Sequence, residues 1–278
     1  MQKLESDIVV VGAGPGGYAA AFYAADLGRK VTLVERDDRL GGVCMNRGCI
    51  PSKALLHATH QIDAARESAH RGIAFGDPKI DLDKLRTWKG GILDKLGQGI
   101  AGLAKLRGVT VLKGRGVFED SGTLRVETTA GQQFLGFQKA IIAVGSRPAM
   151  PRQFDLGNPR VMTSTEALEI ADIPERLLVI GGGYIGMELG TVYARLGSRV
   201  TVIEALDAIL AGADPDLVRP VAAYARKAFQ EVRLQATVKA MSTAGKQIRV
   251  VSEHGGKELD ELYDRVLVSV GQIGRAHV

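Results

Sequence analysis

The chain has 278 residues, 45% of them hydrophobic and 24% charged, and at roughly 100–200 residues per domain this length predicts about two folded domains. Its 35 glycines follow no three-residue period and the apolar fraction is high, which excludes collagen-like and intrinsically disordered chains. The net charge of +5 arises from mixed signs and does not indicate nucleic-acid binding. Two cysteines are too few for a disulfide-rich scaffold or a four-cysteine zinc site.

The N-terminal segment predicts a buried strand rather than a targeting or membrane segment. No run reaches the roughly 18 consecutive apolar residues of a membrane span. The apolar run that starts at Ile8 ends at the glycines of residues 12–17, too early for a secretory signal. The sequence therefore predicts a cytoplasmic protein without a membrane segment.

One pattern occurs twice along the chain: a buried strand, a glycine-rich turn, a helix and a second strand. The first copy comprises strand 7–11, turn 12–17, helix 18–27 and strand 30–35; the second comprises strand 176–180, turn 181–186, a helix to about residue 196 and strand 199–204. The first glycines of the two turns are 169 residues apart, and so are the acidic residues Glu35 and Glu204 that end the second strands. Two coincident offsets indicate two dinucleotide-binding domains.

The glycine spacing G-x-G-x-x-G has a physical reason in each copy. The first glycine allows a tight turn, the second leaves room for a pyrophosphate and the third lets the helix pack on the strand. These positions are Gly12, Gly14 and Gly17 in the first copy and Gly181, Gly183 and Gly186 in the second. A glycine-rich turn without a ligand is the competing interpretation.

The acidic residue that ends each second strand predicts which nucleotide is bound. Glu35 and Glu204 are placed to accept hydrogen bonds from adenosine ribose hydroxyls. A carboxylate repels a 2′-phosphate, and Glu204 is followed by Ala205 and Leu206 rather than by an arginine. We therefore expect the second site to prefer NAD to NADP, the alternative being an ordinary surface glutamate.

The remaining segments predict an α/β fold. Residues 52–69 and 85–106 are expected as helices, 109–126 and 133–137 as a small antiparallel meander, and 140–144 as a buried strand. A helix at 217–230 and another meander at 232–270 follow the second copy. The predicted architecture is two Rossmann-like domains, 1–150 and 151–271, each with a parallel sheet and a small antiparallel meander.

The two cysteines, Cys44 and Cys49, lie five residues apart before the first long helix. In a regular helix such Cα atoms are about 8.6 Å apart, whereas a disulfide requires less than about 7 Å. A bonded pair therefore needs a distorted turn, which Asn46 and Gly48 permit, ahead of a helix that Ser52 caps.

The surroundings of the pair favour redox reactivity. Both thiols lie near a helix N-terminus, and Arg47 and Lys53 add positive charge that stabilises a thiolate. Buried core cysteines are one alternative. A zinc site completed by His57 and His60 is another, but its spacing fits no usual zinc pattern and no metal is expected.

The segment 41–53, GGVCMNRGCIPSK, between two dinucleotide motifs resembles the pyridine nucleotide–disulfide oxidoreductases, and within them the dihydrolipoamide dehydrogenases, the E3 components of 2-oxoacid dehydrogenase complexes. The resemblance extends over residues 5–271. It implies that dihydrolipoamide, carried by a lipoyl domain, reduces a disulfide in which Cys44 exchanges with the substrate and Cys49 faces the flavin. FAD bound by the first domain then passes electrons to NAD⁺ bound by the second.

The resemblance also assigns individual positions. Lys53 is expected near the flavin, paired with Glu188, and Tyr184 is expected to gate the nicotinamide. Arg47 and Met45 replace commoner apolar residues and are expected to tune reactivity. The expected cofactor contacts are Gly12, Gly14, Gly17, Glu35, Gly42, Lys53, Gly116 and Gly145 for FAD, and Gly181, Gly183, Tyr184, Gly186, Glu204, Val238 and Gly271 for NAD.

The end of the chain departs from the family pattern. The last six residues, Ile273–Val278, are what a common sequencing-adapter stretch encodes, so residues 272–278 are expected to be a non-native tail. The C-terminal dimerisation domain is then absent, and an N-terminal fragment of a homodimeric enzyme is expected to bind FAD poorly and turn over negligibly. An NADPH-dependent glutathione- or mercuric-type reductase and a non-catalytic folded remnant remain the alternatives.

Overall fold

The structure is a computed structural model that describes residues 4–275, and its backbone divides into two compact units. Of the described residues, the first unit contains 4–51, Trp88–Arg147 and 273–275; the second contains Ser52–Thr87 and Pro148–Gln272. The helical segment 52–87 thus groups with the second unit, although the sequence analysis places it in domain 1–150. That domain division stays a prediction.

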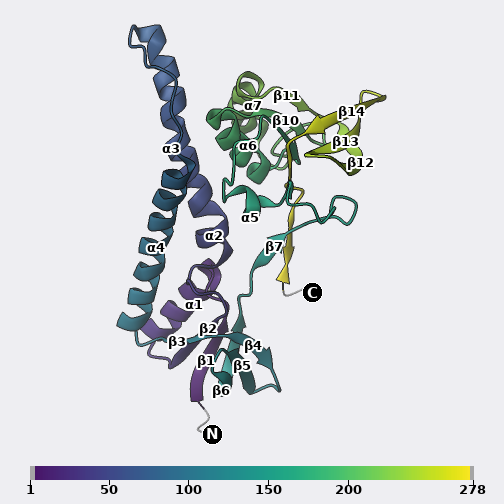
Figure 1. Cartoon of the computed structure of the whole chain (residues 1–278). Coiled ribbons are helices and arrows are strands. Elements are labelled where there is room, and N and C mark those ends of the chain that lie inside the picture. The colour runs from purple at the N-terminus through teal and green to yellow at the C-terminus, as the bar shows by residue number, and fades with distance from the viewer. Residues whose placement is uncertain (1–3, 276–278) are drawn as a thin grey trace. The chain divides into compact units, whose positions relative to one another are not determined.

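The first unit is built on a six-stranded sheet of order β3-β2-β1-β6-β5-β4 (Figure 1). Its strands are β1 (Leu4–Val11), β2 (Val31–Glu35), β3 (Thr110–Lys113), β4 (Arg115–Phe118), β5 (Thr123–Thr128) and β6 (Gly131–Ile142). β1 pairs in parallel with β2 and β6, while β4, β5 and β6 pair antiparallel. The meander joins the parallel strands because β6 is continuous through both. Residues 110–113, expected in the meander, instead form a strand parallel to β2.

Helices pack against the first sheet. Single residues of these helices show why they begin or pack where they do. α1 (Pro15–Asp26) begins with proline at its first position, where the missing N–H costs nothing. α2 (Gly42–Arg47) and the start of α3 (Cys49–Ser68) follow β2. α4 (Leu82–Leu106) includes Gly97, where an added β-carbon would lie 2.6 Å from the Arg39 side chain. Gly97 therefore serves close packing, whereas the other α4 glycines face open space.

The second unit repeats the α/β plan around a five-stranded parallel sheet of order β11-β10-β9-β15-β8. The strands are β8 (Val161–Met162), β9 (Arg176–Ile180), β10 (Arg199–Ile203), β11 (Glu231–Arg233) and β15 (Arg265–Val268). The three-stranded antiparallel sheet comprises β12 (Ala236–Ala244), β13 (Gln247–His254) and β14 (Lys257–Tyr263). The expected meander 232–270 is thus shorter, because its two ends belong to the parallel sheet.

Three helices and one short 3₁₀ turn complete the second unit. They are α5 (Ser164–Ala167), α6 (Tyr184–Leu196), α7 (Pro215–Ala228) and the 3₁₀ turn η1 (Ala69–Arg71). β7 (Ser146–Pro148) and β16 (Gln272–Gly274) form a separate two-stranded sheet. The expected non-native tail is therefore described up to Arg275, and its last three residues lie outside the described part of the chain.

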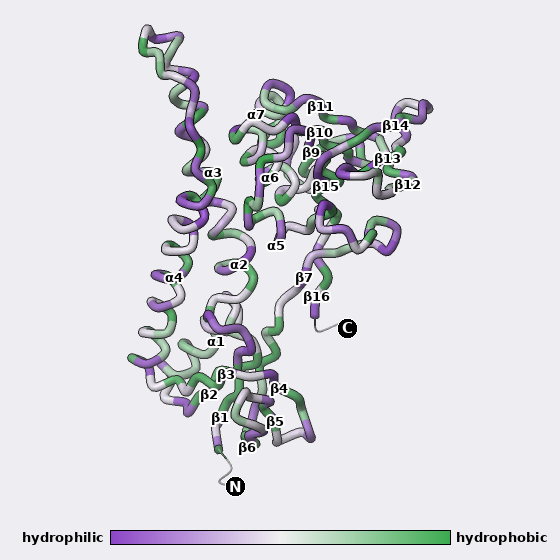
Figure 2. Tube along the Cα trace, in the orientation of Figure 1, coloured by the Kyte–Doolittle hydropathy of each residue, from purple (hydrophilic) through white to green (hydrophobic). Residues whose placement is uncertain are grey.

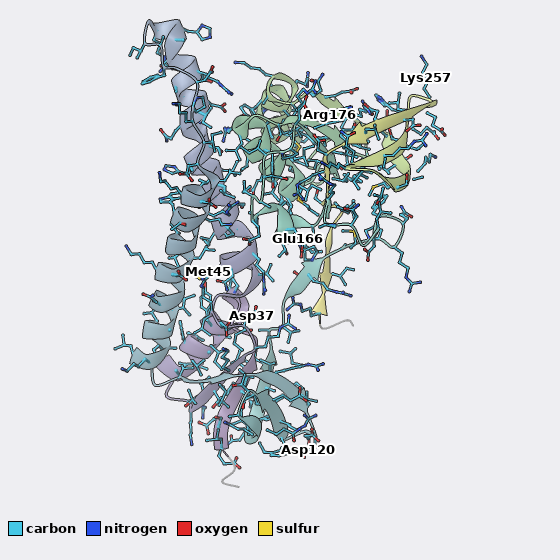
Figure 3. The ribbon with its side chains drawn as sticks, viewed as in Figure 1. Asp37, Met45, Asp120, Glu166, Arg176 and Lys257 are labelled. Carbon is cyan, nitrogen blue, oxygen red and sulfur yellow. The ribbon has the colours of Figure 1, made fainter. Side chains whose placement is uncertain are left out.

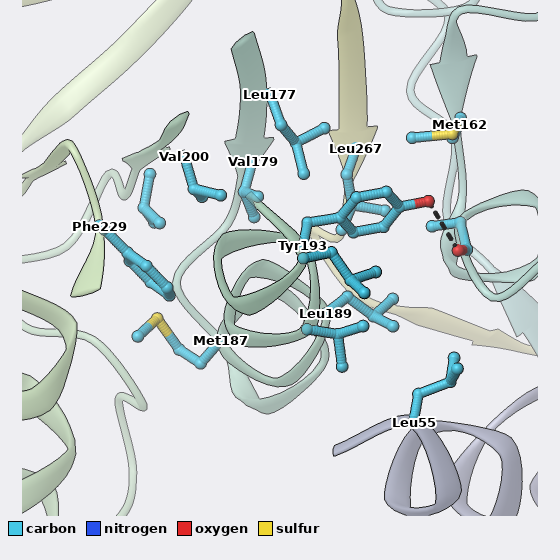
Figure 4. Packing of buried hydrophobic residues seen from close by; sticks show 14 of the residues in the cluster. Leu55, Met162, Leu177, Val179, Met187, Leu189, Tyr193, Val200, Phe229 and Leu267 are labelled. Carbon is cyan, nitrogen blue, oxygen red and sulfur yellow. Dashed lines mark hydrogen bonds between the residues drawn. The ribbon is translucent and has the colours of Figure 1, made fainter. Parts of the chain in front are cut away.

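The larger core of the second unit packs α6 on the parallel sheet (Figure 4). Leu177 and Leu267 project from strands, Leu189 and Tyr193 from α6, and all four are at most 1% exposed. The buried Tyr193 hydroxyl donates to the Ala167 carbonyl at 2.9 Å, and burial raises the pKa of this phenol. The polar end of the side chain is satisfied, so the ring can lie inside the core.

Hydrophilic and hydrophobic residues alternate along the two long helices α3 and α4 (Figure 2). Within residues 4–275, none of the helices has the length and apolar character to cross a bilayer. The architecture is α/β with two Rossmann-like units, each combining parallel and antiparallel strands, as the sequence predicts.

Candidate functional site

The two glycine-rich turns have nearly the same backbone conformation. Gly12 and Gly181 have φ values of 100° and 104°, and a β-carbon on them would lie 2.3 Å and 2.6 Å from a carbonyl oxygen of a neighbouring segment. Gly14 and Gly183, the N-caps of α1 and α6, have φ/ψ of −68°/179° and −72°/177°. Only the first glycine of each turn is thus required by backbone conformation.

The third glycine of each turn permits close contact between helix and strand. A β-carbon on Gly17 would lie 1.7 Å from the carbonyl oxygen of Gly12, and one on Gly186 would lie 2.1 Å from that of Gly181. Any side chain would therefore displace the helix from the turn. The steric role that the spacing predicts for this position is present in both copies.

The acidic residue of each copy binds the backbone of its own turn. Glu35 Oε2 accepts from the Ala13 amide at 2.7 Å, and Glu204 Oε2 accepts from the Gly182 amide at 2.6 Å. In both carboxylates Oε1 accepts from the amide two residues further on, at 2.9 Å and 2.8 Å. A carboxylate offers about four acceptor positions, so each can still accept hydroxyl groups. The sequence predicts a ribose role for these carboxylates but does not reveal their hydrogen bonds to the turn backbone.

A further correspondence between the copies was not predicted. The Gly41 amide donates to the Ala13 carbonyl, and the Leu210 amide donates to the Gly182 carbonyl, both at 2.9 Å. Gly41 and Leu210 have positive φ, 110° and 53°, and are again 169 residues apart. The repeat thus extends past the acidic residue, but glycine matched with leucine gives no sequence signal.

The cysteine-bearing helix α2 starts directly against the first turn. A β-carbon on Gly42 would lie 2.5 Å from Gly14 Cα and 3.1 Å from Gly14 N. Cys44, two residues further on, is partly exposed, and the buried Met45 that follows packs into the core of the unit (Figure 3). Helix α2 therefore holds Cys44 within a turn of the predicted pyrophosphate site.

The two cysteines lie on different helices because the chain breaks at Gly48. α2 ends at Arg47, Gly48 has φ/ψ of −150°/−110°, and the exposed Cys49 opens α3. A β-carbon on Gly48 would be 3.4 Å from Cys44 Cα. The distorted turn is present, but the following helix begins at Cys49 and not near Ser52, three residues later, where the sequence analysis expected it.

Arg47 and Asn46 tie α2 to the segment that follows β2. The Arg47 guanidinium pairs with Asp37, whose amide donates to Glu35 Oε1. The Asn46 amide group donates to two backbone carbonyls of residues 39 and 40, each at 3.2 Å. The helix that carries Cys44 is thereby linked through Asp37 to the acidic residue of the first copy.

In the second unit, one carboxylate of α6 binds two consecutive residues of α3. Lys53 Nζ lies 2.6 Å from Glu188 Oε1, and Ser52 Oγ donates to Glu188 Oε2 at 2.9 Å. This ion pair is the one that the family resemblance implies. Ser52 lies three residues inside α3 and not at its N-cap position, and its hydroxyl donates to Glu188.

The other predicted contact residues are distributed over both units. Gly116 lies on β4, and Gly145 has φ of 70° with open space where a β-carbon would project. Val238 is buried on β12, Gly271 has φ of 138°, and Tyr184 is 64% exposed at the start of α6. Their binding roles stay predictions. Among residues 4–275, no group of three His, Cys, Asp or Glu side chains could hold a metal ion.

Comparisons with known proteins agree with this arrangement. Residues 6–277 match the family model described as pyridine nucleotide-disulphide oxidoreductase. Dihydrolipoyl dehydrogenases of Vibrio parahaemolyticus and Haemophilus influenzae are 41% and 42% identical over 275 residues, 98% of this chain and 57% of theirs. That of Staphylococcus aureus is 42% identical over 269 residues, 97% of this chain and 57% of its own length.

A solved structure extends the likeness to three dimensions. The Cu(II) complex of the HOCl-induced flavoprotein disulfide reductase RclA from Escherichia coli matches with a TM-score of 0.80 and 28% identity, covering 98% of this chain and 57% of its own. The chain therefore spans somewhat more than half the length of the proteins it matches. It belongs to the pyridine nucleotide-disulphide oxidoreductase family.

Proposed function

We propose that this chain is the nucleotide-binding part of a dihydrolipoyl dehydrogenase, a flavoprotein that passes electrons from dihydrolipoamide through Cys44 and Cys49 and FAD to NAD⁺. The observation that carries the proposal is the backbone contact between Gly42 and Gly14. It puts the start of the cysteine helix on the turn that would hold the flavin pyrophosphate. The names of the most similar curated proteins support the same activity.

The first turn fits a dinucleotide. At Gly14 a β-carbon would meet only Gly42 Cα, at 3.8 Å, so glycine leaves a cradle that a side chain would fill. The N-terminus of α1 supplies backbone N–H groups to an anion there. Glu35, held by two backbone amides, has acceptor positions left for ribose hydroxyls. We assign FAD to this turn and NAD to the matching turn at Gly183.

The cysteine pair exchanges with the substrate dithiol. One substrate thiolate attacks Cys44 Sγ of the Cys44–Cys49 disulfide, the S–S bond breaks and Cys49 leaves as a thiolate. The second substrate thiolate then attacks the substrate sulfur of the mixed disulfide and releases Cys44. Two electrons reach the cysteine pair and two protons leave the substrate. FAD, when bound, would carry two electrons from this cysteine pair to NAD⁺.

Lys53 assists by its charge. Cys49 and Lys53 are four residues apart on α3 and therefore lie on one face of the helix, one turn apart. Glu188 pairs with the Lys53 ammonium, so this position carries a positive charge one helical turn after Cys49 in α3. Tyr184, exposed beside the second turn, is assigned to gating of the nicotinamide.

The biological setting follows from the same proposal. The substrate is dihydrolipoamide on a lipoyl domain, the full-length protein is a homodimer, and it works in the cytoplasm. A flavoprotein disulfide reductase with another substrate is the second candidate, favoured by the similarity to the RclA structure; its NADPH-dependent form is the alternative that the cofactor preference tests. The carboxylate of Glu204 favours NAD over NADP, because it would repel the 2′-phosphate of NADP.

Anaerobic titration of the purified chain with excess FAD and dihydrolipoamide tests the function. We expect a long-wavelength absorption band from a cysteine thiolate against the flavin. Cys44→Ser, which has no disulfide to accept electrons, should show the band before any reductant is added and lose it when two electrons reduce the flavin, whereas Cys49→Ser should not show the band in either state. Bound FAD without any such band in the unsubstituted chain would overturn the proposed electron path.

A further inference from the structure

We infer that Ser52 is a positioning residue, which orients the Glu188 carboxylate so that Glu188 holds the Lys53 ammonium at a fixed place. Ser52 touches neither substrate nor cofactor in this assignment. It acts through Glu188. The inference rests on the proposed function only for what the ammonium does, not for how it is held.

The geometry shows a carboxylate held at both oxygens by neighbouring residues. Glu188 Oε1 lies 2.6 Å from Lys53 Nζ, and Glu188 Oε2 accepts from Ser52 Oγ at 2.9 Å. With both oxygens engaged, the carboxylate plane is set by two donors rather than one. A carboxylate that met only the lysine could rotate and let the ammonium follow it.

Burial distinguishes the two donors. The Lys53 side chain is 57% exposed and that of Glu188 26%, and an exposed ion pair with a long flexible lysine is weakly ordered. Ser52 is 5% exposed and has a short side chain with one rotatable bond. The buried hydroxyl is therefore the rigid donor that sets the carboxylate, and the exposed lysine depends on that carboxylate for its position.

A second contact between α3 and α6 holds the two helices together independently of Ser52. Arg195 Nε on α6 donates to Asp63 Oδ2 on α3 at 2.7 Å, and the Tyr224 hydroxyl donates to the same carboxylate oxygen at 2.8 Å. Between the two contacts, Leu55 is fully buried against α6 residues. These contacts keep the helices together without the Ser52 hydroxyl, so its loss releases the carboxylate and not the helix.

The rate at which acetyl N-hydroxysuccinimide acylates Lys53, read by peptide mass spectrometry, tests the inference in the whole chain. The exposed Lys257 serves as internal reference. Ser52→Ala should raise the Lys53 rate relative to Lys257 by about threefold or more, because the loosened ammonium spends less time against the carboxylate. Ser52→Thr, which keeps a hydroxyl, should stay within twofold of the unsubstituted chain. Ser68→Ala, which removes another hydroxyl of α3, should have no effect.

The Glu188→Gln background shows whether Ser52 acts through the carboxylate. Glu188→Gln alone should raise the Lys53 rate at least as much as Ser52→Ala, and adding Ser52→Ala to it should raise the rate no further. An unchanged rate in either single variant would overturn the inference. So would an increase from Ser52→Ala that persists with Gln at 188, since that result means general loosening of α3. The measurement needs no flavin, so its failure is distinct from a missing absorption band.

Discussion

At the scale of single residues, the glycines of each turn divide into those that the fold needs and those that a ligand would need. Gly12 and Gly181 have positive φ and no space for a β-carbon. Gly183 has an ordinary extended backbone, and nothing lies within 4 Å of the position where its β-carbon would be. Its glycine is therefore unexplained by the protein alone and fits a ligand that approaches the backbone.

This difference predicts opposite effects of two alanine substitutions in one turn. Gly183→Ala should leave the thermal midpoint nearly unchanged and weaken NADH binding by about tenfold or more, because a methyl group occupies the place of the phosphate. Gly181→Ala should destabilise the chain by about 2 kcal/mol or more, from its φ and a carbonyl oxygen 2.6 Å away. Circular dichroism melting and NADH fluorescence titration measure the two. Unimpaired NADH binding by Gly183→Ala would remove the ligand explanation.

At the scale of elements, the break in the cysteine segment could be predicted from the sequence, whereas the start of the following helix could not. The chemistry of a disulfide excludes a regular helix between Cys44 and Cys49, and the structure has its break at Gly48. The start of α3 at Cys49 was not predicted, since Ser52 looks like an N-cap but is used by Glu188. Local propensity cannot show a partner 136 positions away.

The break predicts that the two cysteines form an intramolecular disulfide readily. Exposure of the chain to oxidised glutathione should remove two hydrogens and block alkylation of both thiols. Gly48→Ala should slow this reaction several-fold, because its β-carbon would lie 3.1 Å from the Val43 carbonyl oxygen. Gly72→Ala, a glycine substitution remote from the pair, is the control and should leave the rate of disulfide formation unchanged. If glutathione adducts accumulate on both cysteines instead, the break does not bring the sulfurs together.

A second element-scale prediction concerns the contact between β11 and β14. The Arg233 guanidinium, with a side chain 7% exposed, pairs with Glu261, and its hydrogen bond lowers the pKa of that carboxyl. A lowered pKa in the folded state means that this pair stabilises the fold above the ordinary glutamate pKa, and that the contribution is lost as pH falls through the lowered value.

Glu261→Gln should therefore destabilise the chain at pH 7 by about 2 kcal/mol or more, because it leaves the buried Arg233 guanidinium with only the more exposed carboxylate of Glu231. Its thermal midpoint should also fall less steeply than that of the unsubstituted chain as pH drops below about 4.5. Asp260→Asn, which breaks the exposed pair with Arg249 on the neighbouring strand, should change the midpoint at pH 7 little. Parallel pH profiles of the Glu261→Gln variant and the unsubstituted chain would contradict the assignment.

At the scale of the whole molecule, the chain uses one backbone frame twice and has its two cysteines where the copies diverge. The turn, the acidic residue that binds it and the amide that donates to a turn carbonyl all recur at an offset of 169 residues. The last matching pair is Gly41 and Leu210, whose amides donate to the turn carbonyls. Immediately afterwards the first copy forms α2 with Cys44, whereas the second continues as a loop to α7. The repeated glycines made both frames predictable from sequence. The pairing of residues 110–113 with β2 was not, because an edge strand and a meander strand share the same alternation.

The two frames also differ in the residue after the acidic one, Arg36 in the first copy and Ala205 in the second, and the nucleotide-binding role proposed for Glu204 predicts which nicotinamide cofactor the second copy prefers. Glu204 accepts from the amide of Leu206, whose side chain is 54% exposed. The unsubstituted chain should bind NADH at least about tenfold more tightly than NADPH, a difference of roughly 1.4 kcal/mol. The double substitution Glu204→Ala with Leu206→Arg should reverse the order, because it replaces the repelling carboxylate by a guanidinium that pairs with the 2′-phosphate. Leu206→Arg alone should leave NADH favoured, since Glu204 still repels the phosphate. Fluorescence titrations with both nucleotides decide the matter, and equal affinities in the unsubstituted chain would show that Glu204 holds only the turn and not a ribose.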